Sequence, residues 1–293
     1  MKLTNIYNLP QTFINVLSRS KYTKGKANLS VTELLQPPQL VQLRKKHWDE
    51  LEEDVADKIW AIFGTAIHSV LELGADHNHL IEERIHATVD GWDISGAVDL
   101  QKQEEDGIVI SDYKTAGVWA VMNEKIEWEQ QLNMYAWLVE KVKRTPVKKV
   151  EIVAVIRDWS RRDAKNREDY PEAPIKVLDI PLWSYEDREE FIKQRIQLHS
   201  NASLASEIGE EYAPCSPADM WEKPTTYAVK KAGNKRATAV CATYEEAELR
   251  AKVSNGGEKY EIEVRPGERT RCAEFCQVSN FCKQYQDYLE EEE

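Results

Sequence analysis

Two aspartates and a lysine, Asp99, Asp112 and Lys114, are the residues whose types and spacing most clearly suggest chemistry. We expect Asp99 to end one strand, and Asp112 and Lys114, two apart on the next strand, to share one face of a sheet. Close carboxylates repel unless a cation neutralises them, and Mg²⁺ or Mn²⁺ prefers such oxygens, the Tyr113 carbonyl included. The cation would lower the pKa of a bound water and Lys114 would orient it. The pattern predicts metal-assisted phosphodiester hydrolysis; the alternative for Lys114 is a surface ion pair with Asp112.

A histidine on a predicted helix is the next candidate for this site. Hydrophobic periodicity predicts a helix over residues 55–74, on which His68 and Glu72 lie four residues apart and share a face. His68 is predicted to bind the metal, and Glu72 is a weaker candidate for a ligand or for a partner of one. The alternative for His68 is a hydrogen-bonded core histidine.

Gln131 and Tyr135 lie one turn apart on a second predicted helix, over residues 127–142. Their carboxamide and phenol would reach the same cleft and position a phosphate or Lys114. Simple helix packing is the alternative, especially for Tyr135.

Turn signals and periodicity define the elements that must carry these residues. Asp90-Gly91 is a strong hairpin signal, and Ser30 with Glu33 three residues later predicts a capped helix start. The order of helix, strand meander, helix and strand predicts an α/β fold with a mixed central sheet flanked by helices. The predicted strands cover residues 80–89, 92–100, 150–157 and 175–182, residues 108–110 open a further strand that carries Asp112 and Lys114, and a further helix covers 185–199.

The 293 residues divide into three predicted segments. An N-terminal helical or irregular segment covers 1–54, a core covers 55–206, and a C-terminal region covers 207–293. This last region opens with a linker and continues with a hairpin around Gly233-Asn234, a helix, a strand and a cysteine cluster.

Composition narrows the class of protein. Hydrophobic residues make up 42% of the chain and charged residues 31%, which is typical of a soluble enzyme. Apolar runs are too short for a membrane span and the N-terminus lacks a signal-peptide pattern, so we expect a cytoplasmic protein. The net charge of −12 argues against indiscriminate coating of nucleic acid. Three basic islands, at 19–26, 157–167 and 230–236, are either phosphate contacts or solvated loops.

Four of the five cysteines form a candidate cofactor site. Cys272, Cys276 and Cys282 fall within eleven residues, and Cys215 lies upstream in a Pro-Cys-Ser-Pro turn. Three clustered thiols with one distant thiol suit an iron–sulfur cluster, whose ligands are thiolates, better than the paired Cys-x2-Cys units of structural zinc sites. Zinc and free thiols remain alternatives, and Cys241 is predicted to be an ordinary buried thiol.

Four motifs in order resemble the RecB-type branch of the PD-(D/E)XK nucleases. They are Gly-x-x-x-His at 64–68, Gly-x-x-Asp at 96–99, Asp-x-Lys at 112–114 and Gln-x-x-x-Tyr at 131–135. The branch includes nuclease domains of recombination helicases, CRISPR-associated adaptation nucleases and phage exonucleases, and the chain looks most similar to the phage-borne exonucleases. The resemblance implies a restriction-endonuclease-like core. It implies metal binding by His68, Asp99, Asp112 and the Tyr113 carbonyl, catalysis by Lys114, and support from Gln131 and Tyr135.

Similar proteins often carry a [4Fe–4S] cluster, with one cysteine before the core and three after it. No cysteine occurs near residues 31–40 of this chain, so Cys215 is our choice for the fourth ligand beside Cys272, Cys276 and Cys282. The resemblance implies an Mg²⁺- or Mn²⁺-dependent DNA exonuclease of recombination, repair or phage DNA processing, in a bacterial cell or a phage-infected host. A recombination or single-strand-binding protein is a possible partner. A structure-specific endonuclease and a DNA-binding module with a vestigial site are the alternatives.

Overall fold

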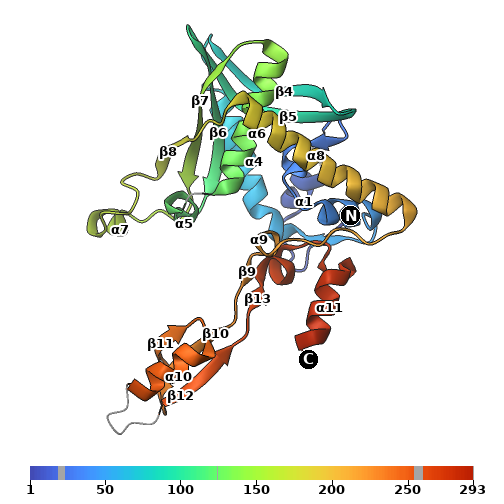
Figure 1. Ribbon diagram of the computed structural model, residues 1–293. Coiled ribbons are helices and arrows are strands. Elements are labelled where there is room, and N and C mark those ends of the chain that lie inside the picture. Colours follow the sequence, from blue (N-terminus) through green and yellow to red (C-terminus); the bar gives the residue numbers. More distant parts are fainter. Residues whose placement is uncertain (19–23, 124, 254–259, 293) are drawn as a thin grey trace. The chain divides into compact units, whose positions relative to one another are not determined.

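The computed structural model describes residues 1–18, 24–123, 125–253 and 260–292. The chain forms two compact units (Figure 1). The first comprises Met1–Gln42 and Trp48–Tyr212, and the second comprises Leu43–His47 and Ala213–Glu293. Arg19 and Lys21 of the first basic island lie outside the described residues. Within the described part of the chain, no helix has the length and apolarity that crossing a membrane requires.

A six-stranded mixed sheet is the centre of the first unit. Its strands run in the order β2-β5-β6-β7-β8, and β4 also pairs with β5. The pairs β4–β5, β5–β6 and β7–β8 are antiparallel, whereas β2–β5 and β6–β7 are parallel. The bounds are β2 Leu29–Ser30, β4 His79–Val89, β5 Trp92–Glu104, β6 Gly107–Ala116, β7 Val147–Ile156 and β8 Ile175–Ile180, and β1 (Lys2–Thr4) and β3 (Glu52–Asp54) form a separate parallel pair.

Helices flank this sheet, which confirms the predicted α/β class (Figure 1). Helix α6 packs against β4 and β7, α8 packs against α6, and α4 packs against β6. Residues 132–139 of α6 are all buried, so this helix lies at the centre of the hydrophobic core. The bounds are α1 Gln11–Ser18, α2 Val31–Leu34, α3 Pro38–Lys46, α4 Ile59–Glu72, α5 Val118–Met122, α6 Ile126–Lys143, α7 Arg161–Asn166 and α8 Tyr185–Ile208, with a 3₁₀ turn at Val55–Lys58 before α4.

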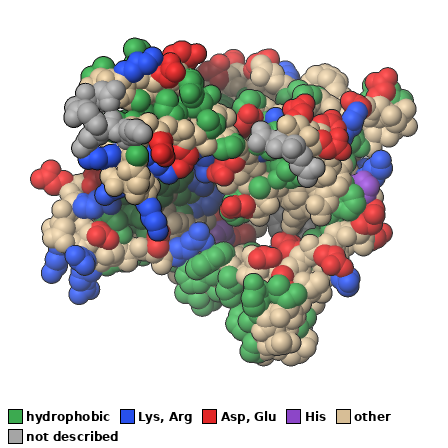
Figure 2. All heavy atoms as spheres, turned by 90° about the horizontal axis from the view of Figure 1, so that it is seen from below, with side chains coloured by type: hydrophobic (Ala, Val, Ile, Leu, Met, Phe, Trp, Pro, Cys, Tyr) green, Lys and Arg blue, Asp and Glu red, His purple; other side chains and the backbone are tan. Residues whose placement is uncertain are grey.

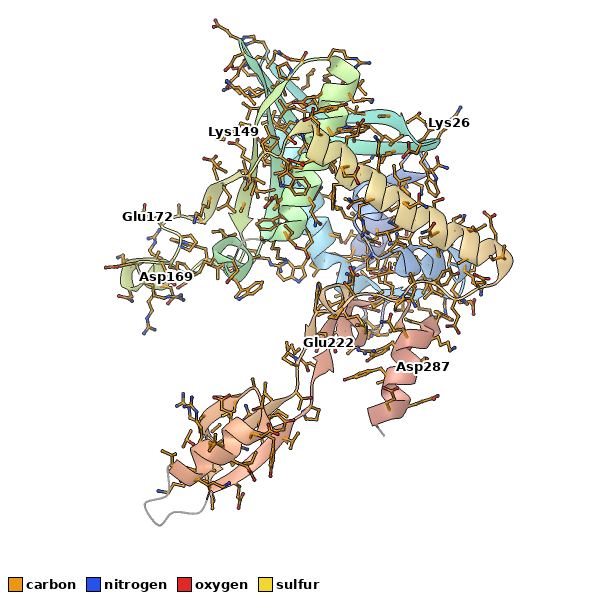
Figure 3. All side chains as sticks on the ribbon, in the orientation of Figure 1. Lys26, Lys149, Asp169, Glu172, Glu222 and Asp287 are labelled. Carbon is orange, nitrogen blue, oxygen red and sulfur yellow. The ribbon has the colours of Figure 1, made fainter. Side chains whose placement is uncertain are left out.

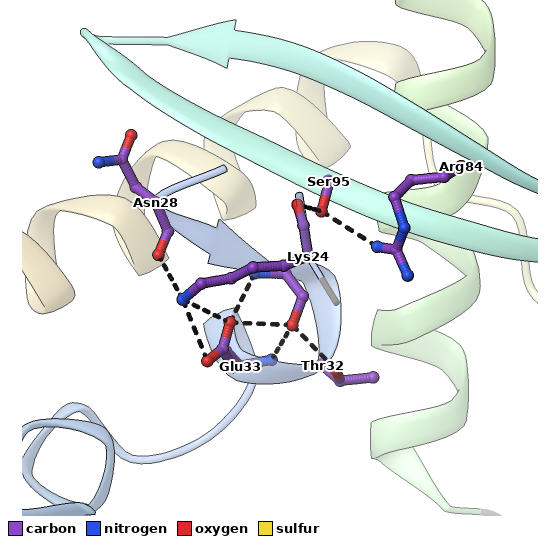
Figure 4. A network of polar contacts seen from close by, with 7 residues as sticks. Lys24, Asn28, Thr32, Glu33, Arg84 and Ser95 are labelled. Carbon is purple, nitrogen blue, oxygen red and sulfur yellow. Dashed lines mark hydrogen bonds and ion pairs between the residues drawn. The ribbon is translucent and has the colours of Figure 1, made fainter. Parts of the chain in front are cut away.

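The predicted cap at Ser30 is present and joins the N-terminal segment to the sheet (Figure 4). The Glu33 N–H donates to Ser30 Oγ, and the Ser30 N–H donates to Glu33 Oε2. Lys24 Nζ lies 3.1 Å from the same carboxylate, and Ser95 on β5 donates to the Lys24 carbonyl. Arg84 on β4 completes the network by donating to Ser95. These bonds fix the start of α2 against the strand that carries the glycine-aspartate motif.

Each basic island places at least one cation in an ion pair. Lys24 pairs with Glu33, Arg167 lies 2.8 Å from Asp169, and Lys230 pairs with Glu263. Figure 3 shows Asp169 on the loop after α7, and Figure 2 shows acidic and basic side chains interspersed over one face. The islands are therefore partly neutralised by neighbouring carboxylates.

The second unit is built from short elements. A three-stranded antiparallel sheet of order β11-β10-β12 packs against α10 around Val229, Cys241 and Ala247. A two-stranded pair, β9 with β13, precedes the last cysteines. The bounds are α9 Pro217–Met220, β9 Glu222–Lys223, β10 Thr226–Lys231, β11 Ala237–Cys241, α10 Tyr244–Val253, β12 Tyr260–Arg265, β13 Glu268–Arg269 and α11 Lys283–Glu292, with a π-helical turn at Arg271–Phe275 and a 3₁₀ turn at Ser279–Phe281.

Candidate active site and cysteine cluster

Asp99 and Asp112 meet where strands β5 and β6 separate. The ladder between these strands ends at the pair Leu100↔Ser111, so the two aspartates are the next residues beyond it. The Tyr113 N–H lies beyond the last backbone pair with β5 and donates to a β5 side chain instead, Asp99 Oδ2, at 2.7 Å. The prediction that Asp99 ends its strand is wrong, because β5 continues past it to the next hairpin. The divergence of the strands, rather than a strand end, opens space beside the carboxylates.

A cavity of about 920 Å³ collects the predicted side chains of the first unit. Helix α4 contributes His68 and Glu72, strands β5 and β6 contribute the carboxylates and the lysine, and α6 contributes the amide and the phenol. Its wall includes His68, Glu72, Asp99, Asp112, Lys114, Gln131 and Tyr135. The fold therefore brings residues as far apart in the sequence as His68 and Tyr135, which are 67 positions apart, to the same cavity.

Gln131 connects the groups around Lys114 through one carboxamide. Lys114 Nζ donates to Gln131 Oε1 at 3.0 Å and lies 2.6 Å from Asp112 Oδ2. The Gln131 amide nitrogen donates to the Tyr135 hydroxyl at 2.9 Å and, more weakly, to Asp112 Oδ1 at 3.4 Å. A lysine only donates and a carboxylate only accepts, so these partners fix the orientation of the amide. The network holds the Lys114 ammonium beside the cavity.

Asp112 is almost fully buried, at 2% exposure, yet one of its oxygens is incompletely satisfied. Oδ2 is within ion-pair distance of Lys114 Nζ, but the geometry of this contact is not that of a hydrogen bond. The ammonium, 2.6 Å away, stabilises the carboxylate whatever the angle. The oxygen still has an unused lone pair that a cation can accept.

His68 lies between the carboxylates and a backbone carbonyl. Its Nε2 is 2.9 Å from the Tyr113 carbonyl oxygen, and its Nδ1 is 3.3 Å from Glu82 Oε1 and 3.7 Å from Asp99 Oδ1. Among the described residues, His68, Glu82 and Asp99 form a group whose ligand atoms all lie within 4.8 Å of one another. The predicted histidine, carboxylate and carbonyl are thus adjacent in space.

The electrostatics of this group reflect its crowding. Burial raises the pKa of Asp99 to about 7, and the negative charge of Asp112 adds to the rise. The hydrogen bond with Glu82 is the main reason that the pKa of His68 rises to about 9, with the Asp99 charge contributing further. The protein alone therefore supplies a cation, the imidazolium, next to carboxylates that favour positive charge. Two carboxylates, a carbonyl and an imidazole form a donor set suited to Mg²⁺ or Mn²⁺.

Sequence reasoning missed Glu82. It lies on β4 where the pairing with β5 skips Glu82 and Asp99, in the strand predicted over residues 80–89, and it lines the cavity. The signal in the sequence is a run of three charged residues, Glu82 to Arg84, that interrupts the strand's apolar pattern. No residue type there indicates the φ of 48° that Glu82 adopts.

The glycine of the Gly-x-x-Asp motif makes room for α6. A Cβ on Gly96 would lie 2.8 Å from the ring of Tyr135 and 2.9 Å from Leu138 Cδ1, closer than side chains approach. By contrast, a Cβ on Gly64 in α4 would meet Thr115 Oγ1 at an ordinary 3.5 Å. Gly96 therefore sets the depth at which Tyr135, and with it the amide one turn earlier, sits against β5.

The second unit brings the four predicted cysteine ligands near one another. Burial raises the pKa of the Cys215 thiol to about 12, and Asp219 and the thiols of Cys282, Cys272 and Cys276 add to the rise through their charges. Burial and the Cys276 and Cys282 thiols raise the pKa of Cys272 to about 11. Mutual electrostatic effects of this kind require proximity.

One side chain joins Cys215 to the last helix. The Cys215 N–H donates to Gln284 Oε1 at 2.8 Å, and Gln284 Nε2 donates back to the Cys215 carbonyl at 2.9 Å. Gln284 follows Cys282 by two residues, so this clamp draws the distant cysteine to the clustered three. Cys241 lies elsewhere, buried against Val229 and Ala247 in the small core of the β-sheet.

Comparisons with known proteins found a matching family and a similar solved structure. A family model described as the PD-(D/E)XK nuclease superfamily matches residues 30–283. The chain is also similar to a solved structure titled "Crystal structure of SSO0001", with 19% identity and a TM-score of 0.41, over 64% of this chain and 82% of that one. No curated protein matches the chain.

Proposed function

Because the chain belongs to the PD-(D/E)XK nuclease superfamily, we propose that it is a RecB-type DNA exonuclease that depends on Mg²⁺ or Mn²⁺. The observation that carries this proposal is the convergence of buried Asp99 and Asp112 with Lys114 and His68 on one cavity. A purely structural ion pair would not need a second buried carboxylate, which costs free energy unless a cation neutralises it. The order of the four motifs supports the RecB-type assignment and the similarity to phage-borne exonucleases.

The residues have distinct roles in this proposal. His68, Asp99, Asp112 and the Tyr113 carbonyl would hold the cation, which supplies charge neutralisation and an acidified water when bound. The unused lone pair of Asp112 Oδ2 fits this role. Lys114 donates to Gln131 and lies in ion-pair contact with Asp112, so it keeps N–H donors for the attacking water or the phosphate. Gln131 and Tyr135 hold the lysine in place.

The substitution Asp112→Asn tests the site. It removes a buried anion and keeps the shape, so the turnover should fall by ~10³-fold or more, which corresponds to about 4 kcal/mol of activation free energy. Circular dichroism should remain that of the native fold. Wild-type cleavage of end-labelled linear DNA by this variant would refute the proposal.

Two alternatives are separated by the choice of substrate. An exonuclease spares covalently closed circular DNA and degrades linear duplex, whereas a structure-specific endonuclease on the same core cuts a circle that contains its target. A vestigial module would bind DNA without cleavage in Mg²⁺ or Mn²⁺. The complete set of Asp99, Asp112 and Lys114 in one cavity favours an active enzyme.

We further propose that Cys215, Cys272, Cys276 and Cys282 bind a [4Fe–4S] cluster with a structural role. The Gln284 clamp supports this ligand set because it positions Cys215 beside the other three. Anaerobically purified protein should show a broad visible absorption band; a colourless protein with stoichiometric zinc would favour the alternative.

The substrate and setting follow from the same proposal. DNA is the expected polymer, and a recombination or single-strand-binding protein is the expected partner of a phage-type exonuclease. The bacterial cytoplasm, including that of a phage-infected cell, is where such DNA is processed.

A further inference from the structure

Glu82 combines two unfavourable features at one position of β4. Its φ of 48° lies in the left-handed region, which costs a residue with a side chain on the order of 1–3 kcal/mol. The pairing of β4 with β5 skips Glu82 and Asp99, which lie between paired residues on facing strands, and like charges that face each other across a sheet destabilise it. The ladder continues on both sides, at Ile81↔Leu100 and Glu83↔Val98, so the irregularity is confined to this one residue.

This backbone conformation is unusual for its location. The other described non-glycine residues with positive φ lie in turns or at helix ends, whereas Glu82 lies inside a strand; they are Asn8, Asp90, Arg144 and Trp221. Local turn chemistry therefore explains those four residues and leaves Glu82 unexplained. Strain that persists without a local cause is typical of functional positions.

The strained conformation delivers the Glu82 carboxylate to His68. Among the described residues, the hydrogen bond of Oε1 with His68 Nδ1, at 3.3 Å, is the one polar contact of this carboxylate. The other ring nitrogen, Nε2, faces the Tyr113 carbonyl at 2.9 Å. The imidazole is thus held from one side, with its second nitrogen directed at the carbonyl that we assign to the cation.

We propose that Glu82 is a positioning residue for the divalent cation, acting through His68. It accepts the Nδ1–H of His68, so that when the Nε2 proton is released to solvent on cation binding, the Nε2 lone pair faces the cation beside the Tyr113 carbonyl and Asp99. Histidines that bind metals commonly donate their second N–H to a carboxylate, and loss of that acceptor lowers metal affinity by ~10–100-fold. This inference rests on the proposed metal site and adds a residue to it.

Binding of Mn²⁺ to the full-length protein, measured by calorimetry or by electron paramagnetic resonance, tests the role. Glu82→Gly removes the carboxylate but suits a positive φ, so the metal-free variant should unfold at the same temperature as wild type or higher. Its affinity for Mn²⁺ should fall ~10–100-fold. Glu82→Gln keeps an oxygen acceptor and should lose less affinity. Unchanged affinity in Glu82→Gly would overturn the inference, as would a fall accompanied by a lower unfolding temperature.

A double-mutant cycle with His68→Gln separates positioning from direct ligation. If Glu82 acts through the imidazole, Glu82→Gly should reduce Mn²⁺ affinity by less than ~2-fold in the His68→Gln background. An equal loss in both backgrounds would contradict positioning and identify Glu82 as a ligand itself.

A further variant distinguishes failure of this inference from failure of the proposed function. Asp112→Asn should strongly weaken Mn²⁺ binding if the cation site is correct. If it does not, the site itself is wrong. If it does, and Glu82→Gly leaves the affinity unchanged, the role of Glu82 alone is refuted.

Discussion

The cavity proposed as the active site and the cysteine cluster hold their candidate ligands in opposite ways. The cavity lies among long elements, with 13 residues in β5, 10 in β6 and 18 in α6. Its side chains form hydrogen bonds with one another, and the His68 imidazolium supplies a positive charge to the carboxylates. Cys272 lies in a five-residue π-helical turn, whereas Cys215, Cys276 and Cys282 lie outside the helices and strands, and Gln284 clamps the backbone of Cys215. The polar side chains of the cavity are thus held by one another, whereas the hydrogen bonds that join Cys215 to Gln284 involve the cysteine backbone and not its thiol.

The difference indicates two uses of a bound cofactor. In the cavity, the cation would serve chemistry, and the surrounding fold is complete without it. Around the cysteines, the short elements would gain stability if four thiolates bound one cofactor, because binding and folding would then be coupled. The raised pKa values of Cys215 and Cys272 show that free thiolates are unfavourable there.

Loss of one cysteine ligand should have the largest effect on structure. Cys282→Ala should abolish the visible absorption band and make residues 213–292 sensitive to protease, while an N-terminal fragment that ends near Tyr212 survives. The reason is that the second unit loses the cofactor that stabilises its short elements. Limited proteolysis followed by mass spectrometry measures this.

Cys241→Ala is the matched control, because it removes an equally buried thiol that lies in the small β-sheet core. It should keep the absorption band and the protease resistance around the cysteine cluster. Equal loss in the two variants would mean that the cluster site is not distinct from the rest of the unit, and the contrast with the cavity would fail.

Loss of Lys114 should have the next largest effect, confined to turnover. Lys114→Met should lower cleavage ~10²–10³-fold, or about 3–4 kcal/mol, because the proton donor beside the cation site is lost. Mn²⁺ affinity should remain or rise, since the variant removes a competing positive charge 2.6 Å from Asp112 Oδ2. Lys165→Met, on the exposed helix α7, is the control. A loss of metal binding equal to the loss of turnover would argue against this division of roles.

Acid should destabilise the chelator-treated protein through a histidine far from the metal ligands. Burial lowers the pKa of His199 to about 4, below its ordinary 6.5, and its Nε2 contacts the Leu34 carbonyl at 3.1 Å. Between these values the unfolded chain binds a proton that the folded chain does not, so stability is full above pH 6.5 and falls toward pH 4. The loss should approach about 3 kcal/mol. Urea unfolding at pH 7 and pH 4.5 measures it.

His199→Gln should reduce this dependence on pH, whereas a substitution of the exposed His77 should leave it intact. An identical pH dependence in His199→Gln would show that the acid sensitivity lies elsewhere in the chain.

Much of this organisation follows from the sequence, for identifiable reasons. Helix α6 was predictable because its apolar residues repeat at helical spacing, and the β4–β5 hairpin because Asp90-Gly91 favours its turn. Helix α8 extends to Ile208 instead of ending at residue 199, because its buried face continues through His199 and Ala202. Histidine and alanine are less apolar than leucine or isoleucine, so the hydrophobic pattern does not reveal this continuation. The predicted segment boundaries at 54 and 206 stay predictions.

The remaining features depend on contacts between distant residues. The separation of β5 from β6 beyond Leu100 decides where Asp99 points, and no local pattern encodes it. The positive φ of Glu82 likewise could not be predicted, because glutamate ordinarily avoids that conformation. The sequence therefore identified the side chains that lie in recognisable motifs, and it missed Glu82, whose place beside His68 depends on an unusual backbone conformation.

The two motif glycines should show the smallest and most specific contrast. Gly96→Ala places a methyl group 2.8 Å from the Tyr135 ring, so α6 or the ring must move, at a cost of roughly 1–3 kcal/mol in unfolding free energy. Because Gln131 donates to the Tyr135 hydroxyl, the shift should disturb Lys114 and lower turnover by ~10²-fold. Thermal unfolding and single-turnover cleavage measure the two effects.

Gly64→Ala is the matched substitution in the neighbouring motif. Its methyl group meets Thr115 Oγ1 at an ordinary 3.5 Å within α4, where alanine favours the helix by up to ~1 kcal/mol over glycine. We therefore expect unchanged or higher stability and nearly normal cleavage. If both variants lost activity equally, close packing at Gly96 would not be what positions the lysine, and the cavity would owe its order to interactions other than those between β5 and α6.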